Sequence, residues 1–266
     1  PGTTETVDDL APPPLTQAAF DRDPEAMRRL LDDGADPNVA MPDGWTPLMA
    51  ASRDGCIPCA EVLVARGADL EARWFNGTTA LMIAASMGRV PMSDALLDLG
   101  ADVNAAADAG MTPLLHAALR GNLDLMRLFV DAGADLDAQN EEGFTPLMLS
   151  VTRSRVPHAR LLLEHGAETE IIDTIGYTAL LRATQFGRPE IVALLLEYGA
   201  DVNHATPDGI TALMLAAIEP SPEKVELLLN AGANPEAQTG EGLSAIDIAE
   251  QLGHPELMLR LPRLRP

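Results

Sequence analysis

The chain has 266 residues, of which 47% are hydrophobic and only 3% aromatic, and its net charge at pH 7 is −22. Forty acidic residues against 18 basic ones argue against binding to nucleic acid or to anionic membranes, since such binding needs a basic surface. No apolar stretch reaches the length of a membrane-spanning helix.

The order of segments along the chain predicts a disordered N-terminal tail followed by an array of repeated structural units. Residues 1–12 are acidic and proline-rich, with too little apolar content to form a core, and are predicted to be disordered. Residues 13–40 form a degenerate capping unit, residues 41–240 the full units, and residues 241–266 the C-terminal capping unit. Because no insertion interrupts these units, residues 13–266 are predicted to form a single array of about eight units.

Two short motifs recur every 33 residues in one register. The first is Gly-Ala-Asp or a close variant, with its glycine at Gly34, Gly67, Gly100, Gly133, Gly166, Gly199 and Gly232. The second is Thr-Pro-Leu-Met or a close variant, beginning at Thr46, Thr79, Thr112, Thr145, Thr178, Thr211 and, more weakly, Ser244. A strict period of this length indicates stacked repeats.

Each motif predicts local structure. A Thr side chain can cap a helix, and Pro in the first turn loses no hydrogen bond, so each Thr is predicted to begin a short, Ala-rich helix. That helix is expected to end at a left-handed glycine such as Gly55 or Gly187. A second helix follows and ends at the next Gly-Ala-Asp. Pairs such as Asp43-Gly44, just before each Thr, predict tight hairpin turns.

With Gly-x-Thr-Pro-Leu-x-x-Ala-Ala and Gly-Ala-Asp-Val-Asn in this register, the chain resembles the ankyrin-repeat family from about Pro13 to Leu259. The resemblance implies an all-α ankyrin-repeat solenoid of stacked helix-turn-helix units with hairpin fingers. The His that is usual after Thr-Pro-Leu is replaced here by Met or Leu. Apolar packing is therefore expected to replace the family's hydrogen bonds at that turn.

The resemblance also implies a concave groove, lined by the finger tips and the exposed side of the first helices, as the binding face. Trp, Tyr and Arg dominate the binding energy of many protein interfaces, and most of the few aromatic residues fall at these register positions. A competing interpretation is that a bulky residue before each Thr packs on the neighbouring finger. The predicted partner-binding residues are Trp45, Arg53, Trp74, Phe75, Met87, Met111, Arg120, Phe144, Arg153, Tyr177 and Phe186.

The leading functional hypothesis is a non-catalytic, monomeric scaffold that binds a partner protein in this groove. The acidic surface would attract a basic partner, or it is a by-product of the repeated Asp. The alternative is a protein that sequesters a small molecule or peptide in an apolar pocket among Trp74, Phe75, Met87 and Met111. Enzyme activity, a cofactor and a metal are not expected, because no nucleophile, phosphate-loop or zinc motif is present.

Three further groups leave alternatives open. Cys56 and Cys59 form a Cys-x-x-Cys at the start of a second helix. The register makes Cys59 a small core residue and places Cys56 where other repeats carry Arg, Asn or His. A purely structural role is favoured, with a stabilising disulfide or a redox or metal function as alternatives. A row of methionines, including Met49 and Met82, is interpreted as core filling and not as a soft-metal site. The Arg-rich segment 152–160 is interpreted as charge balance, with an anion site as the alternative.

Composition also suggests an origin and a location. Abundant Ala and Pro, with seventeen Arg beside a single Lys, suggest a bacterial, high-GC coding bias. A start at Pro1-Gly2 without a signal peptide favours the cytoplasm, with export left open.

Overall fold

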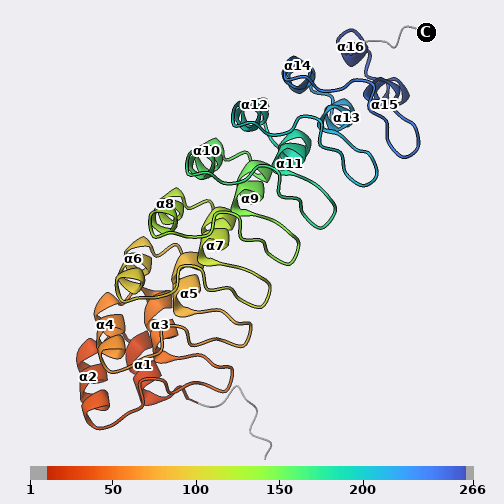
Figure 1. The fold of residues 1–266 in the computed structure, drawn as a ribbon. Helices are drawn as coiled ribbons and strands as arrows, with labels where there is room; N and C mark the ends of the chain where they lie inside the picture. The colour runs from red at the N-terminus through yellow and green to blue at the C-terminus, as the bar shows by residue number, and fades with distance from the viewer. Residues whose placement is uncertain (1–10, 262–266) are drawn as a thin grey trace, which may run out of the picture. The chain divides into compact units, whose positions relative to one another are not determined.

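The computed structural model describes residues 11–261, and these residues fold as α-helices joined by turns and loops (Figure 1). The predicted all-α fold of helix-turn-helix units is confirmed. Residues 1–10 of the expected tail and residues 262–266 of the capping unit lie outside the described residues. The helices are α1 (Pro14–Phe20), α2 (Pro24–Asp32), α3 (Pro47–Asp54), α4 (Ile57–Ala65), α5 (Ala80–Ser86), α6 (Val90–Asp98), α7 (Pro113–Arg120), α8 (Leu123–Asp131), α9 (Pro146–Thr152), α10 (Val156–Glu164), α11 (Ala179–Phe186), α12 (Pro189–Glu197), α13 (Ala212–Ile218), α14 (Pro222–Asn230), α15 (Ala245–Leu252) and α16 (Pro255–Met258).

The chain divides into two compact units, which we describe separately. Among the described residues, unit 1 comprises 11–120 and 131–134, and unit 2 comprises 121–130 and 135–261. Within unit 1, α1, α3, α5 and α7 pack in sequence as one layer of first helices, and α2, α4 and α6 pack as a layer of second helices. Within unit 2, the same two layers are α9, α11, α13 and α15, and α10, α12, α14 and α16. That residues 13–266 form a single array stays a prediction.

The repeated Thr caps its helix as predicted. The backbone N–H of Met49 donates to Thr46 Oγ1 at 3.3 Å, and that of Leu115 donates to Thr112 Oγ1 at 3.2 Å. These bonds satisfy amides that a helix start leaves without an intrahelical partner. The methionines of the same motif, such as Met49 and Met148, are buried, so the Met row fills the core as predicted.

The glycines that follow the first helices do not all have the same role. Gly55 and Gly253 are left-handed helix caps with φ of 74° and 76°, as predicted. For Gly187 the prediction is wrong, because its φ is −83°. A Cβ on Gly187 would lie 2.6 Å from the Ala183 carbonyl oxygen, so close approach is what requires glycine there. Ser154 occupies the equivalent place in its repeat and adopts φ 53°, a conformation that disfavours a side chain.

The loop before each first helix folds back as a hairpin finger. In the first finger, the Gly44 N–H donates to the Met41 carbonyl at 2.8 Å, and the Met41 N–H donates to the Trp45 carbonyl at 2.9 Å. Gly44 has φ 88°, which a tight turn of this kind needs. Within each unit the fingers project beside the first helices (Figure 1). In the part of the chain that the structure describes, no helix has the length and apolar character needed to cross a bilayer.

Candidate partner-binding surface

Two neighbouring fingers of unit 1 bring three of the predicted aromatic residues together. The Trp74 ring meets Trp45 and Phe75 edge to face, with centroid distances of 5.0 and 4.5 Å. Trp74 Nε1 also donates a hydrogen bond to Asp43 Oδ2 at 3.0 Å. Each aromatic pair contributes about 0.5–1.5 kcal/mol beyond its buried area. The cluster therefore holds Phe75, which is 69% exposed, in a fixed position.

Arg53 extends this cluster to the end of α3. Its guanidinium carbon lies 4.7 Å from the ring centroid of Phe20, and its hydrogen bond to Asp54 raises the pKa of Arg53. Arg53 and Phe20 line a pocket of about 310 Å³ together with Trp45 and Trp74. The pocket has mainly apolar walls, and its charged lining residues are Arg53, which is paired with Asp54, and Asp43. Sequence reasoning missed Phe20 because it lies in the degenerate first repeat, outside the aligned finger positions.

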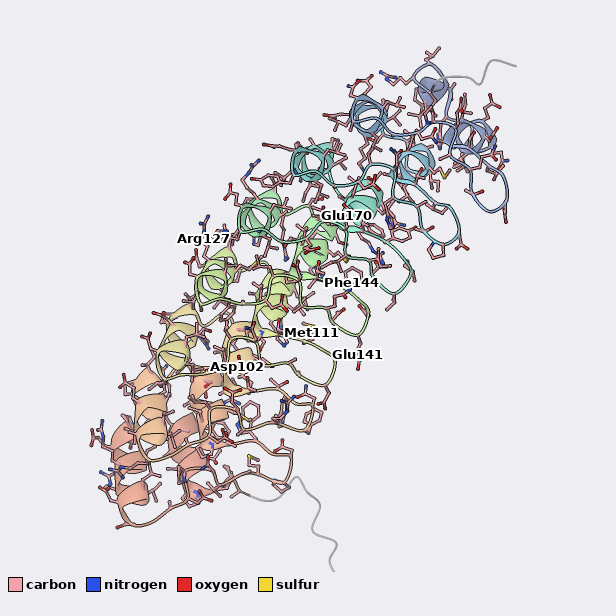
Figure 2. All side chains as sticks on the ribbon, in the orientation of Figure 1. Asp102, Met111, Arg127, Glu141, Phe144 and Glu170 are labelled. Carbon is pink, nitrogen blue, oxygen red and sulfur yellow. A yellow bond between two sulfur atoms is a disulfide. The ribbon has the colours of Figure 1, made fainter. Side chains whose placement is uncertain are left out.

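The other predicted residues of unit 1 are not among those that line this pocket. Met87 directly follows α5 and is 50% exposed. Met111 belongs to the third finger, where it is partly buried (Figure 2). Arg120 is the last residue of α7 and is exposed. These three residues stay predicted contact residues.

In unit 2, the predicted residues Phe144 and Tyr177 enclose an arginine that sequence reasoning missed. The Arg182 guanidinium carbon lies 4.8 Å from each ring centroid. Its Nε and Nη2 reach Asp173 Oδ2 at 2.7 and 2.5 Å. The side chains of Asp173 and Arg182 are 0% and 13% exposed, so this ion pair is buried. Cation–π contact and ion pair together fix the finger to α11.

Alignment of the repeats could have drawn attention to Arg182. The equivalent positions on the other first helices are mostly apolar, and a lone arginine among them is out of pattern. Its partner could not be inferred, because the Asp173 side chain reaches it across the turn between finger and helix. The equivalent positions are Ala50, Ile83, His116, Leu149, Leu215 and Ile248.

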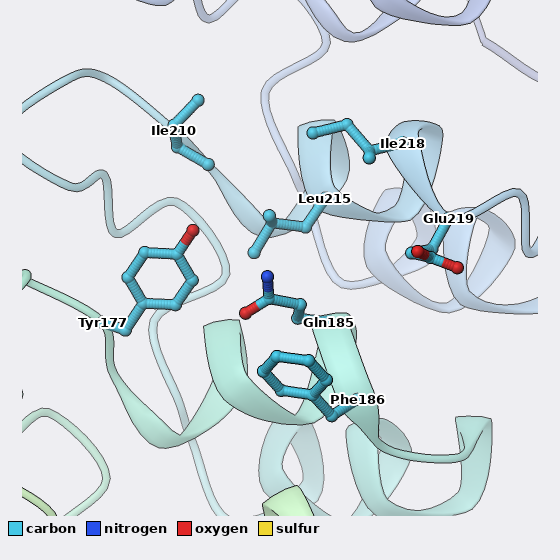
Figure 3. A pocket seen from close by; sticks show the side chains of 7 residues that line it. All are labelled: Tyr177, Gln185, Phe186, Ile210, Leu215, Ile218 and Glu219. Carbon is cyan, nitrogen blue, oxygen red and sulfur yellow. The ribbon is translucent and has the colours of Figure 1, made fainter. Parts of the chain in front are cut away.

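Tyr177 and Phe186 line a pocket of about 400 Å³ at the ends of α11 and α13 (Figure 3). Its walls are mainly apolar, and Phe186 and Ile218 remain 53% and 41% exposed. Two acceptors also line it. Glu219 lies just after α13, and the Gln185 Oε1 is buried without a hydrogen-bond partner among the described residues.

A second pocket of unit 2, of about 630 Å³, shares Ile210 with the first. Leu243 and Ile248 supply apolar surface, and the carboxylates are Asp208 and Glu241. Two acidic and partly apolar pockets therefore adjoin along consecutive fingers of unit 2.

Lys224 lies close to this region but is turned away from solvent. It is 7% exposed, and its Nζ donates to the Thr184 carbonyl at 2.7 Å. Burial lowers the pKa of Lys224, and the nearby Glu219 carboxylate opposes that effect. A cation suits the carbonyls at the end of a helix, so Lys224 ties α14 to the last turn of α11.

Arg153 directly follows α9 and is exposed. Partial burial, and then the charge of Arg153, lowers the pKa of the neighbouring Arg155. Arg153 is not among the residues that line the two pockets of unit 2, and it stays a predicted contact residue.

Cys56 and Cys59 form a disulfide at the start of α4. Cys59 is buried, as the register suggests, and Cys56 is buried as well, although other repeats carry polar residues at its position. The interpretation favoured from the sequence, structural cysteines without a bond, is corrected to a bonded pair. The helix start brings their Cα atoms to 5.3 Å, which is within the usual range for a disulfide. Across residues 11–261, no three His, Cys, Asp or Glu side chains gather as metal ligands would.

Comparison with known proteins finds one family along almost the whole described chain. The family model described as "Ankyrin repeats (3 copies)" matches residues 15–107, 105–173 and 180–261. A search of curated proteins found no match.

Proposed function

The chain belongs to the ankyrin-repeat family, and from this premise we propose that it is a non-catalytic scaffold that holds a partner protein. Ankyrin repeats serve in general as protein-interaction scaffolds, and the family is typically non-catalytic. We propose that the binding face of each unit lies where the fingers meet the C-terminal ends of the first helices. The expected partner is a protein with a basic surface, bound by a monomer without a cofactor.

The distribution of exposed apolar side chains is the observation that carries this proposal. Nine large apolar side chains are exposed among the described residues. Exposed apolar surface that gathers on one face is typical of interaction sites. Tyr198 and Leu259 lie elsewhere, and the other seven belong to the finger loops or to the ends of first helices: Phe75, Met87, Ile172, Ile175, Phe186, Ile218 and Leu252.

The chemistry of the predicted residues supports the same face. In unit 1, Trp45, Trp74 and Arg53 line one pocket, and these residue types most often dominate binding energy. In unit 2, Tyr177 and Phe186 line another. Trp45 and Trp74 pack on each other, and Tyr177 packs on Arg182, so these rings would lose little conformational freedom when a partner binds.

Affinity capture with chemical cross-linking tests the proposal. One variant combines W45A, W74A and F75A in unit 1, and a second combines Y177A and F186A in unit 2. A control variant, Y198A with L259A, removes exposed apolar side chains away from the proposed face. We expect recovery of the partner to fall at least about tenfold in one or both face variants and to stay unchanged in the control. Equal recovery from all proteins would refute the assignment.

A small-ligand function is a second candidate, because the pocket of about 400 Å³ lies in the size range of small-molecule sites. The sequence had suggested such a site in unit 1. Of the four residues predicted for it, only Trp74 is among those that line the unit 1 pocket, and Phe75, Met87 and Met111 are not. A thermal-shift screen against a metabolite library tests this candidate, since a bound ligand raises the unfolding temperature. A shift that F186A or W74A abolishes, with no protein captured, would favour it.

A further inference from the structure

We infer that the two adjoining pockets of unit 2 form an acidic groove for a partner segment that carries apolar side chains next to lysine or arginine. This inference rests on the proposed function and specifies the chemistry of the partner. We define the unit 2 groove by its apolar residues Phe186, Ile210 and Ile218 and its carboxylates Asp208, Glu219 and Glu241.

The two pockets are spaced by one repeat. The first lies between the fingers of Tyr177 and Ile210, and the second between those of Ile210 and Leu243. Packed helices lie roughly 8–10 Å apart, so the pockets are about that far from each other. A polyproline II segment rises about 3.1 Å per residue with three residues per turn, so two apolar side chains three residues apart lie on one face, about 9 Å apart, and would fill both pockets.

The apolar part of the groove is open to a ligand. Phe186 and Ile218 are two of the exposed large apolar residues, and both stand at the mouth of the first pocket (Figure 3). Leu215 and Ile248 are buried beneath the two pockets that they line. Covering this surface with apolar side chains of a partner is favourable because it removes apolar area from water.

The charge presented in the groove is negative. Glu219 lines the first pocket, Asp208 and Glu241 line the second, and the lining residues of both pockets include no Arg, Lys or His. Two of the basic side chains of unit 2 are already engaged within the protein. Lys224 is buried and donates to the Thr184 carbonyl, and Arg182 is paired with Asp173. A cationic segment therefore complements the groove, and an acidic one is repelled.

A hydrogen-bond acceptor in the first pocket points to the same kind of ligand. The Gln185 Oε1 is buried without a partner among the described residues. Leaving such a group unsatisfied is costly, and a donor on the ligand would relieve it. Backbone amides and basic side chains carry such donors, whereas a pure hydrocarbon ligand does not.

Synthetic peptides of defined sequence test the inference on the full chain. Three fluorescent peptides, each about twelve residues long, carry two leucines three residues apart. The residues that flank the leucines are Lys in the first peptide, Gln in the second and Glu in the third. We expect fluorescence anisotropy to detect binding of the Lys peptide, with the Glu peptide at least about tenfold weaker. Raising the salt concentration should weaken the Lys peptide most.

Matched variants separate the groove from the general acidity of the chain. The groove variant combines D208N, E219Q and E241Q, and the control combines E164Q, E190Q and E197Q on the second helices, which removes the same charge. We expect the groove variant to weaken the Lys peptide at least about tenfold and the control to change its affinity less than about twofold. F186A with I218A should weaken all three peptides, and circular dichroism should show unchanged helix content.

Several outcomes would overturn the inference. Equal binding of the Lys and Glu peptides, or an equal loss in the groove and control variants, would show that the groove has no charge preference. If no peptide binds while capture of a protein is still lost in Y177A with F186A, this inference is wrong and the proposed function stands. If capture is also insensitive to every face variant, the proposed function is wrong as well.

Discussion

The fingers of the two units close the same turn with side chains at different positions. In unit 2 the acceptor is the first finger residue: Asn140 Oδ1 accepts from the N–H groups of Glu142 and Phe144, at 3.1 and 2.8 Å. Asp173, Thr206 and Thr239 accept equivalent bonds in the next three fingers. In unit 1 the first finger residue is Met41, Trp74 or Ala107, whose side chains offer no such acceptor. There Asp43 and Asn76, two residues later, accept from the N–H groups of Trp45 and Thr78.

This difference shows how a repeat can gain a binding residue without losing its turn. In unit 1 the acceptor moves by two residues, and the first position becomes free for Trp74, whose ring joins Trp45 and Phe75. In unit 2 the first position keeps its structural role. Asp173 also has a second role: its other carboxylate oxygen, Oδ2, pairs with Arg182, and the Arg182 guanidinium packs on the ring of Tyr177.

The largest effect is expected for D173A in unit 2. It removes the turn acceptor and leaves the Arg182 charge buried without its partner, so we expect the free energy of unfolding to fall by about 3–5 kcal/mol. Urea denaturation followed by circular dichroism measures this. The control is D173N with R182L, which reproduces the Asn140 and Leu149 of the preceding repeat and should recover most of the loss. A loss below about 1 kcal/mol for D173A would contradict a buried pair.

W74A in unit 1 is expected to have the next largest effect. It removes two aromatic pairs, each contributing about 0.5–1.5 kcal/mol, so the free energy of unfolding should fall by about 1–3 kcal/mol. W74D should recover part of this loss because Asp at the first finger position can accept the turn bonds, as Asp173 does. If W74D is no more stable than W74A in the same denaturation experiment, the two ways of closing the finger are not interchangeable.

A107D should instead stabilise unit 1. The finger of Ala107 has Ala at both the first and the third position, so neither position supplies a side-chain acceptor. A new Asp would accept from the N–H of Met111, and we expect a gain of about 0.5–1.5 kcal/mol. A106D is the control, since it adds the same charge one residue away. Equal urea midpoints for A107D and A106D would show that the turn does not use the acceptor.

The smallest effect is a pH dependence of unit 1. His116 stands in the same register position as Arg182, and burial, followed by the charge of Arg120, lowers its pKa. The unfolded chain then binds more protons, so stability is lost as pH falls from the ordinary His pKa of about 6.5 towards the folded value. We expect the urea midpoint of H116L to fall less than that of the parent between about pH 7.5 and pH 5. Identical pH profiles would contradict this.

The fold could be predicted from sequence because its determinants are local and repeated. A capping Thr such as Thr46 and a turn glycine such as Gly44 each act within a few residues, and the 33-residue period confirms them several times. The contacts that sequence reasoning missed each occur in one repeat alone, so the 33-residue period gives no sign of them. Arg182 contacts aromatic rings outside its own helix, and Phe20 contacts the guanidinium of Arg53 on another helix. Gly187 is required by close packing that no local pattern records. The bonded state of Cys56 and Cys59 likewise follows from geometry and not from spacing.

Lys224 has a practical consequence for anyone who labels or tags this protein. It is the only lysine of the chain, and its Nζ is held against the last turn of α11. Amine-reactive dyes, and enzymes that attach modifiers to lysine, therefore reach this side chain only when α14 separates from α11. The rate at which Lys224 becomes acylated therefore reports how often α14 separates locally from α11.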